Sequence, residues 1–153
     1  MDFEEIKKEM MKGREIEDII DCFDWREFEL FCARILEEHG WKAQTTFRFK
    51  LKRRYEIDIL AKKGNRVLAI DCKHWGVRPG KASQLRKAAD KQTERVEQLS
   101  KIRTLDSLWE RTEFYSLLIT LLQEDITQEN GVWIVPVFKL NDFLLNHDAY
   151  LEP

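Results

Sequence analysis

The sequence predicts an α/β fold in which helices pack against a central sheet. Some segments carry apolar residues at the three- and four-residue spacing of helices, and others carry the alternating or continuous apolar pattern of strands. In order they read as helix, three strands, helix and strand, which is an α/β sandwich in outline. The 153 residues, with 43% hydrophobic and 35% charged side chains, have the size and composition of one globular domain.

The first third of the chain predicts three helices. Segments 3–12 and 14–21 form two short ones, with Ile6, Met10, Ile16, Ile19 and Ile20 as their apolar positions. A stronger helix begins at Asp24, an N-cap with Glu27 three residues on, and ends at Gly40. Its apolar stripe consists of Trp25, Phe28, Cys32, Ile35 and Leu36.

Three strands are predicted next, at about 42–50, 54–62 and 66–74, and a long helix follows at about 82–102. The apolar side of that helix consists of Leu85, Ala88, Val96, Leu99 and Ile102.

The last part of the chain contains two strand-like segments, at 114–121 and 132–137, and a helix capped at Asn141. The core residues of this helix are Leu140, Phe143 and Leu144. We therefore expect one domain over residues 1–153. Its core spans about 24–122, and the N-terminal helices 3–21 and the C-terminal strand-helix segment 131–148 pack on that core.

The Gly64-Asn65 turn predicts a tight hairpin in which Lys63 faces Arg66. Counting back along both strands places Asp58 opposite Asp71, and Glu56 opposite Lys73. The same register gives an apolar side made of Tyr55, Ile57, Ile59, Leu68, Ile70 and Cys72.

The charged side of this hairpin allows two interpretations. It is either an ordinary exposed face, with Glu56 and Lys73 as a surface ion pair, or a cation site, because opposed carboxylates repel each other unless a cation lies between them. Hard oxygen ligands for Mg²⁺ beside a fixed ammonium are what metal-assisted attack on a phosphodiester needs.

Charge is unevenly distributed along the chain. Residues 42–95 hold 16 Lys and Arg against 5 Asp and Glu, whereas the remaining residues hold 10 against 23. Arg48, Lys50 and Lys52 alternate with two Phe residues and share one face of a predicted strand. This basic segment is either a surface that binds a polyanion or a solvated face whose charges balance in three dimensions.

Several short segments within about residues 24–99 together resemble the PD-(D/E)xK nuclease superfamily, in particular its Mrr-type restriction endonuclease and archaeal Holliday-junction resolvase branch. They are D-W-R-E-F-E-L-F-C-A-R-I-L-E-E-H-G-W, Y-E-I-D-I-L-A and L-A-I-D-C-K-H-W. The resemblance implies a restriction endonuclease-like three-layer α/β/α core with a mixed central sheet. It implies catalytic roles for Glu29, Asp58, Asp71, Lys73 and Gln92. The residue before Asp58 is Ile57 where the family has Pro, a common variation in this branch.

The resemblance implies a Mg²⁺-dependent endonuclease that hydrolyses phosphodiester bonds in DNA during restriction, repair or recombination, and Mn²⁺ can substitute for Mg²⁺. Asp58, Asp71 and the backbone carbonyl of Cys72 would bind the metal, and Glu29 would act directly or through water. Lys73 would orient the attacking water. The residues alone also allow an exposed helical role for Glu29 and a satisfied core amide for Gln92, and the alternative function is an inactive nucleic-acid-binding module of the same fold.

We expect DNA as the partner. Because the sequence has no helix-turn-helix or zinc module to recognise a DNA sequence, a homodimer or a targeting protein is a further expected possibility. The residues expected to contact nucleic acid are Arg48, Lys50, Lys52, Arg53, Arg54, His74, Arg78 and Lys81, whereas Trp75 is expected to pack. Without a run of ~18 apolar residues, and with a charged N-terminus, the sequence predicts no membrane partner and a cytoplasmic location. Cys22, Cys32 and Cys72 are expected to be buried free thiols.

Overall fold

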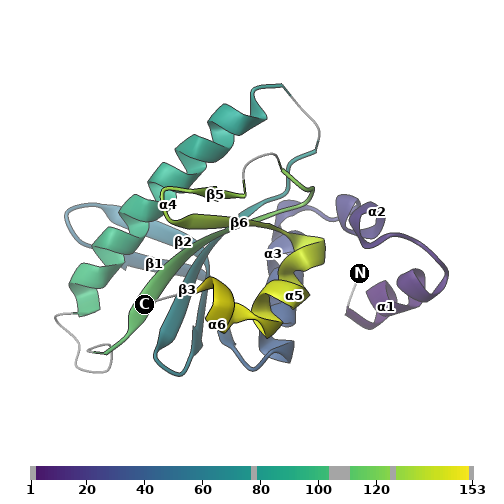
Figure 1. Ribbon diagram of the computed structural model, residues 1–153, viewed down its shortest axis with the longest axis horizontal. Coiled ribbons are helices and arrows are strands. Elements are labelled where there is room, and N and C mark those ends of the chain that lie inside the picture. Colours follow the sequence, from purple (N-terminus) through teal and green to yellow (C-terminus); the bar gives the residue numbers. More distant parts are fainter. Residues whose placement is uncertain (1–2, 77–78, 104–110, 125–126, 152–153) are drawn as a thin grey trace.

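The computed structural model describes residues 3–76, 79–103, 111–124 and 127–151, and it contains a six-stranded mixed sheet between helices (Figure 1). The strand order is β1-β2-β3-β4-β6-β5. Strands β1, β2 and β3 are antiparallel neighbours, β3, β4 and β6 are parallel, and β5 is antiparallel to β6. The predicted α/β architecture with a mixed sheet is therefore confirmed.

The elements have the following bounds. The helices are α1 (Phe3–Met11), α2 (Ile16–Asp21), α3 (Trp25–Glu38), α4 (Lys81–Arg103), α5 (Leu140–Leu145) and α6 (His147–Tyr150), with a 3-10 turn at Val137–Lys139. The strands are β1 (Lys42–Lys50), β2 (Arg54–Lys63), β3 (Arg66–Lys73), β4 (Glu113–Thr120), β5 (Gln128–Glu129) and β6 (Val132–Pro136).

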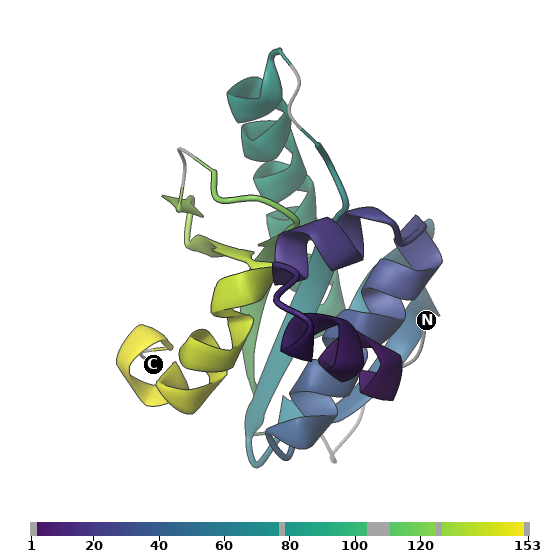
Figure 2. The same ribbon diagram turned by 90° about the vertical axis from the view of Figure 1, so that its right-hand side faces the viewer.

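The helices cover both faces of the sheet (Figures 1 and 2). Helices α1, α2, α3 and α5 share one large apolar core with one face, and α4 packs against the other face. Among the described residues, no helix is both long and apolar enough to cross a membrane.

Helix α3 begins with the predicted capping box, because the Asp24 carboxylate accepts from the Glu27 N–H at 2.8 Å and the Glu27 carboxylate accepts from the Asp24 N–H at 3.3 Å. Its predicted apolar stripe is wrong at the first position, since Trp25 is 65% exposed. Trp25 lies in the first turn, and the buried face starts at Phe28, three residues later.

The hairpin of β2 and β3 has the predicted register near its turn. Gly64 has φ +61°, and the pairs run from Lys63 with Arg66 to Ile59 with Ile70. The paired ladder ends there, so the predicted cross-strand pairs of Asp58 with Asp71 and of Glu56 with Lys73 are wrong.

The ladder ends because β1 and β2 are kinked at the same level. Thr46 has φ 55°, a left-handed backbone conformation that a β-branched residue rarely adopts, and the pairing of β1 with β2 skips Thr46 and Asp58. Side chains change faces there: Ile59 packs on the α3 side, whereas Ile57 packs on the α4 side. The single apolar side expected for this hairpin is therefore wrong at Ile57.

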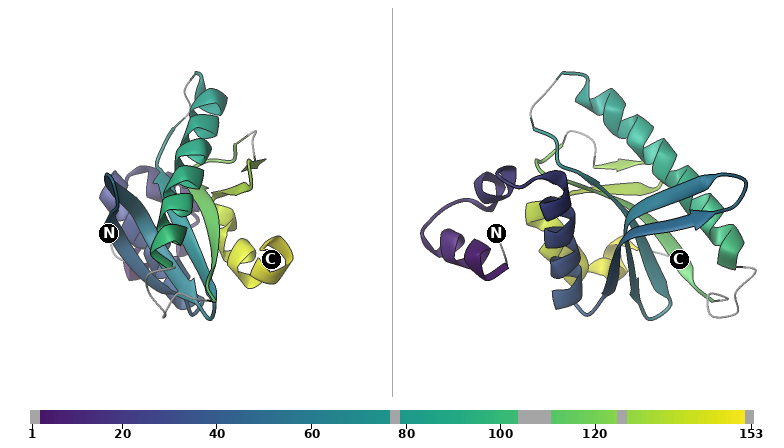
Figure 3. Two further views of the ribbon diagram at one scale, coloured as in Figure 1. Left: turned by 90° about the vertical axis from the view of Figure 1, so that its left-hand side faces the viewer. Right: turned by 180° about the vertical axis from the view of Figure 1, so that it is seen from behind.

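Beyond the kink, residues 47–57 form an arm that bends over α4 (Figure 3). Phe47 and Phe49 of the arm pack in the same cluster as Leu99 of α4. The kink and this packing give the sheet an outlying hairpin that faces the helix instead of continuing the plane of the sheet.

Some smaller predictions also fail. Asn141 does not cap the last helix, because α5 starts one residue earlier and the Asn141 Oδ1 lies 2.6 Å from Nε2 of His39. Cys22 is exposed, although Cys32 is buried and Cys72 is half-buried, and all three are free thiols. Met10 is exposed as well. The two-residue strand β5 was not expected, because so short a segment has no periodicity.

Candidate active site

The end of β3 carries a buried carboxylate between two cations. Asp71 is 5% exposed, and its Oδ2 lies 3.1 Å from Lys73 Nζ and 3.8 Å from Arg95 Nη1. Neither contact has hydrogen-bond geometry, so this buried oxygen accepts no hydrogen bond from the described residues. Since a buried acceptor without a partner is costly, a further donor or a cation would stabilise this oxygen.

Asp58 approaches Asp71 from the kink in β2. Its Oδ2 accepts a hydrogen bond from the Cys72 N–H at 2.9 Å, which ties the kink to β3. Burial raises the pKa of Asp58 to about 7, and the neighbouring Asp71 carboxylate acts in the same direction. The two predicted metal ligands are thus brought together by a backbone hydrogen bond beyond the end of the ladder.

Glu29 belongs to the same group of charges. It is 5% exposed on α3, which excludes the exposed helical role, and its Oε2 lies 3.5 Å from Arg26 Nη1. Burial raises the pKa of Glu29, and the nearby Glu56 and Asp71 act in the same direction.

Gln92 reaches the site from α4. It is fully buried, its Nε2 donates to the Ala69 carbonyl at 2.8 Å, and its Oε1 accepts from Arg95 Nη1 at 3.0 Å. The amide is therefore satisfied and links β3 to Arg95. Sequence reasoning missed Arg95, although it lies three residues after Gln92 and so on the same face of a helix.

Five residues expected to contact nucleic acid lie on the arm and are exposed. They are Arg48, Lys50, Lys52, Arg53 and Arg54. Two of them also make ion pairs: Arg48 Nε lies 3.1 Å from Glu56 Oε2, and Arg53 pairs with Glu94 of α4.

The other three lie elsewhere. His74 faces the α3 side, with Nε2 2.9 Å from the Ile20 carbonyl oxygen and its ring 5.2 Å from that of Phe28, so this geometry favours packing. Lys81 is bound to Glu124 at 2.6 Å in a largely buried pair. Arg78 lies outside the described residues.

The donor set fits a hard divalent cation. Mg²⁺ usually keeps several waters and binds proteins through one or two carboxylates. Asp58 and Asp71 supply two carboxylates, one with an oxygen that lacks a hydrogen bond, and the Cys72 carbonyl lies between Asp71 and Lys73 in the chain. Within the described part of the chain, no three or more His, Cys, Asp or Glu side chains lie close enough together to bind one ion.

The geometry of these carboxylates, beside a lysine at the end of a strand in an α/β/α sandwich, matches a nuclease class, and the comparisons with known proteins agree. The Mrr_cat family model, described as "Restriction endonuclease", matches residues 20–104, which is more than half of the chain. The chain belongs to this restriction endonuclease family, within the PD-(D/E)xK superfamily. Members of the family typically depend on a divalent metal.

A relative and two solved structures are also similar. An uncharacterized protein of Archaeoglobus fulgidus is 33% identical over 128 residues, which are 83% of this chain and 94% of the relative. The crystal structure of a protein of unknown function, AF1548, has a TM-score of 0.40 at 19% identity and covers 76% of this chain. That of protein VC1899 from Vibrio cholerae has a TM-score of 0.45 at 17% identity and covers 80%. The matched part is 52% of the first structure and 32% of the second.

Proposed function

We propose that this chain is a Mg²⁺-dependent endonuclease that hydrolyses phosphodiester bonds in DNA, with Mn²⁺ able to replace Mg²⁺. The observation that carries the proposal is the pair of apposed carboxylates, Asp58 and Asp71, beside the ammonium of Lys73. The raised pKa of Asp58 supports the proposal, because a proton or a cation between two close carboxylates would stabilise them.

Each group has a defined role in the proposed reaction. Asp58, Asp71 and the Cys72 carbonyl would hold the metal, and Glu29 would hold one of its waters. A bound divalent cation polarises the phosphate and lowers the pKa of the attacking water. Lys73 would orient that water and offset the negative charge of the transition state, so that in-line hydrolysis leaves a 5′-phosphate and a 3′-hydroxyl.

Gln92 acts in this proposal as a positioning residue, because it touches the β3 backbone and Arg95 and not a carboxylate. The exposed cations of the arm would contact the DNA backbone, where affinity depends on charge and salt. The sequence contains no helix-turn-helix or zinc module for recognising a DNA sequence, so a homodimer or a targeting protein would supply that recognition. Sedimentation with and without DNA would test the homodimer.

One observation favours the alternative, an inactive nucleic-acid-binding module of the same fold. Lys73 and Arg95 already neutralise Asp71. Such a module would bind DNA without cutting it.

A cleavage assay separates the two functions. Supercoiled plasmid is incubated with the protein in Mg²⁺, Mn²⁺ or EDTA, beside Asp71→Asn and the matched surface variant Asp21→Asn, which changes an exposed carboxylate on α2. We expect the wild type and Asp21→Asn to nick or linearise plasmid only with metal, and Asp71→Asn to be inert. If the wild type and both variants bind DNA at low salt and none cuts with either metal, the module stands and the enzyme proposal fails.

A further inference from the structure

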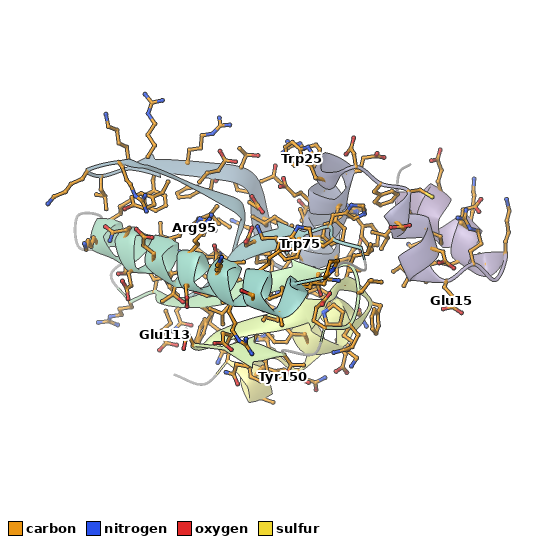
Figure 4. The ribbon with its side chains drawn as sticks, turned by 90° about the horizontal axis from the view of Figure 1, so that it is seen from above. Glu15, Trp25, Trp75, Arg95, Glu113 and Tyr150 are labelled. Atoms are coloured by element: carbon orange, nitrogen blue, oxygen red, sulfur yellow. The ribbon has the colours of Figure 1, made fainter. Side chains whose placement is uncertain are left out.

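A charged groove separates the arm from α4 and leads to the carboxylates. Its outer hollow, of about 320 Å³, has four cations and two carboxylates in its lining, which consists of Arg53, Arg54, Tyr55 and Glu56 of the arm and Lys91, Glu94 and Arg95 of α4. Its inner hollow, of about 240 Å³, is lined by Asp71, Lys73 and Trp75 together with Lys87, Lys91 and Arg95. The hollows share Lys91 and Arg95 and are therefore adjacent, and Figure 4 shows Arg95 and Trp75 along this line.

The α4 wall of the groove is a row of cations. Lys87, Lys91 and Arg95 lie four residues apart, so they share one helix face and follow one another at about 6 Å along the axis. Lys87 and Lys91 are exposed, whereas Arg95 is half-buried beside Asp71. Positive charge therefore continues from the surface to the carboxylates.

Aromatic rings accompany these cations. Tyr55 lines the outer hollow, where its ring stacks on Phe49 with centroids 5.1 Å apart. Trp75 lines the inner hollow, with Lys73 Nζ 5.4 Å from its ring centroid. Cations that follow a backbone and aromatic rings that stack on bases are the combination by which proteins hold single-stranded nucleic acid without reading its sequence.

Contacts hold the arm against α4 beside the groove. The arm is closed against α4 by the Arg53–Glu94 ion pair and by Phe49 in the same apolar cluster as Leu99. The outer hollow, at about 320 Å³, lies at the lower end of the range of about 300–1,000 Å³ for small-molecule sites, and the inner one, at about 240 Å³, lies below it, so each holds no more than about one nucleotide. A single strand with one nucleotide in each hollow matches these volumes, and a pair of strands exceeds them.

We propose that this groove holds a single, unpaired DNA strand and leads it to the carboxylates, so that the substrate is DNA with a single-stranded segment next to the cleaved bond. The inference rests on the proposed nuclease function, which it deepens by naming the form of the substrate. Lys87 and Lys91 contact the phosphates, and Trp75 stacks on a base.

Binding in EDTA tests the groove without cleavage. Labelled single-stranded DNA, a blunt duplex, a fork with one unpaired arm and single-stranded RNA are titrated with wild type, with Lys87→Gln/Lys91→Gln and with the equal-charge control Lys42→Gln/Lys139→Gln, whose residues are exposed and outside the groove. We expect the single strand and the fork to bind more tightly than the duplex. With about 0.7 counterions released per phosphate contact on a single strand, the groove variant should lower the slope of log K against log salt by about 1.4, and the control should not.

A second pair of variants tests stacking. Trp75→Leu keeps an apolar side chain against the cluster around Leu85, and Trp75→Phe keeps an aromatic ring. Loss of one stacked base weakens single-strand binding by about 5- to 150-fold, so Trp75→Leu should show that loss and Trp75→Phe should retain most of the affinity. Circular dichroism and urea unfolding verify that both variants are folded.

The results separate this inference from the proposed function. The proposal that the groove holds a single strand is refuted if a blunt duplex binds as tightly as the single strand, or if the groove variant binds like its control. Either result refutes it even if the protein cuts plasmid. RNA that binds more tightly than DNA of the same sequence overturns the assignment to DNA. Groove-dependent binding of single-stranded DNA by a protein that never cuts supports the groove, and the nuclease function then fails alone.

Discussion

Replacing Asp58 by Asn should stabilise the protein at neutral and alkaline pH. The folded protein raises the pKa of this carboxyl from 3.8 to about 7, because the side chain is largely buried and faces Asp71. At 1.36 kcal/mol per pKa unit, a shift of this size corresponds to roughly 4 kcal/mol of strain in the ionised form. Because Asp58 keeps part of its surface in solvent, we expect Asp58→Asn to raise the free energy of unfolding by about 2–4 kcal/mol at neutral and alkaline pH.

The sign of the pH dependence follows from proton binding. Between about pH 4 and pH 7 the folded state holds the Asp58 proton that the unfolded chain has released, so the free energy of unfolding falls as pH rises through this window and levels off above about 7. Asn is neutral at every pH, and its carbonyl oxygen can still accept from the Cys72 N–H. The advantage of Asp58→Asn should therefore be small at pH 4 and full at pH 8.

Urea unfolding at pH 4, 6 and 8 measures this difference, with Asp21→Asn as the control for loss of an exposed carboxylate. The slope of the free energy against urea should not change, since the same surface is exposed on unfolding. The reasoning is refuted if Asp58→Asn is less stable than wild type at pH 8, or if its advantage is equal at all three pH values.

Three further substitutions test other parts of the structure by urea unfolding. Gln92→Leu should cost about 1–3 kcal/mol, because the buried Ala69 carbonyl loses its donor, and an unchanged stability would contradict that bond. Glu124→Ala should cost about 3–5 kcal/mol, because it leaves Lys81 unpaired in a largely buried position; a loss of less than about 1 kcal/mol would favour the surface role expected from the sequence. Trp25→Ala should have a free energy of unfolding within about 0.5 kcal/mol of wild type, since this side chain is 65% exposed. A loss as large as that of a buried aromatic residue would instead show that Trp25 packs in the apolar stripe of α3.

The sequence predicted the hairpin near its turn because turn chemistry is local. Gly64 and Asn65 fix the pairing of the five residues on each side, and that register is confirmed. The prediction failed beyond Ile59 because alternation assumes a continuous strand, and nothing in a two-residue period marks the kink at Thr46 and Asp58. Asp58 and Asp71 still come together, through the Cys72 N–H and not through the ladder.

The environment of each basic residue could not be predicted, since it depends on segments distant in the sequence. Lys81 and His74 were expected to contact nucleic acid, the latter because it directly follows Lys73. Instead Lys81 pairs with Glu124 and His74 lies against the Ile20 carbonyl, each more than 40 residues away in the sequence. Arg95 was missed for the same reason, because its proximity to Asp71 depends on how α4 lies across the sheet. The burial of Gln92 was predictable, since it lies between Ala88 and Val96 on the apolar stripe of its helix. Glu29 lies at the edge of its stripe, so the sequence left both a buried and an exposed position open.

The most direct test of the central claim is the rate of DNA cleavage in Mg²⁺ by wild type and by Lys73→Met. Methionine keeps an apolar side chain of similar length and removes the ammonium, which lies 3.1 Å from Asp71 Oδ2 and 5.4 Å from the centroid of the Trp75 ring. We predict a loss of at least about 100-fold in cleavage rate, as for other groups that stabilise a transition state, with urea unfolding still cooperative. Cleavage by folded Lys73→Met at the wild-type rate would contradict the assignment of this site.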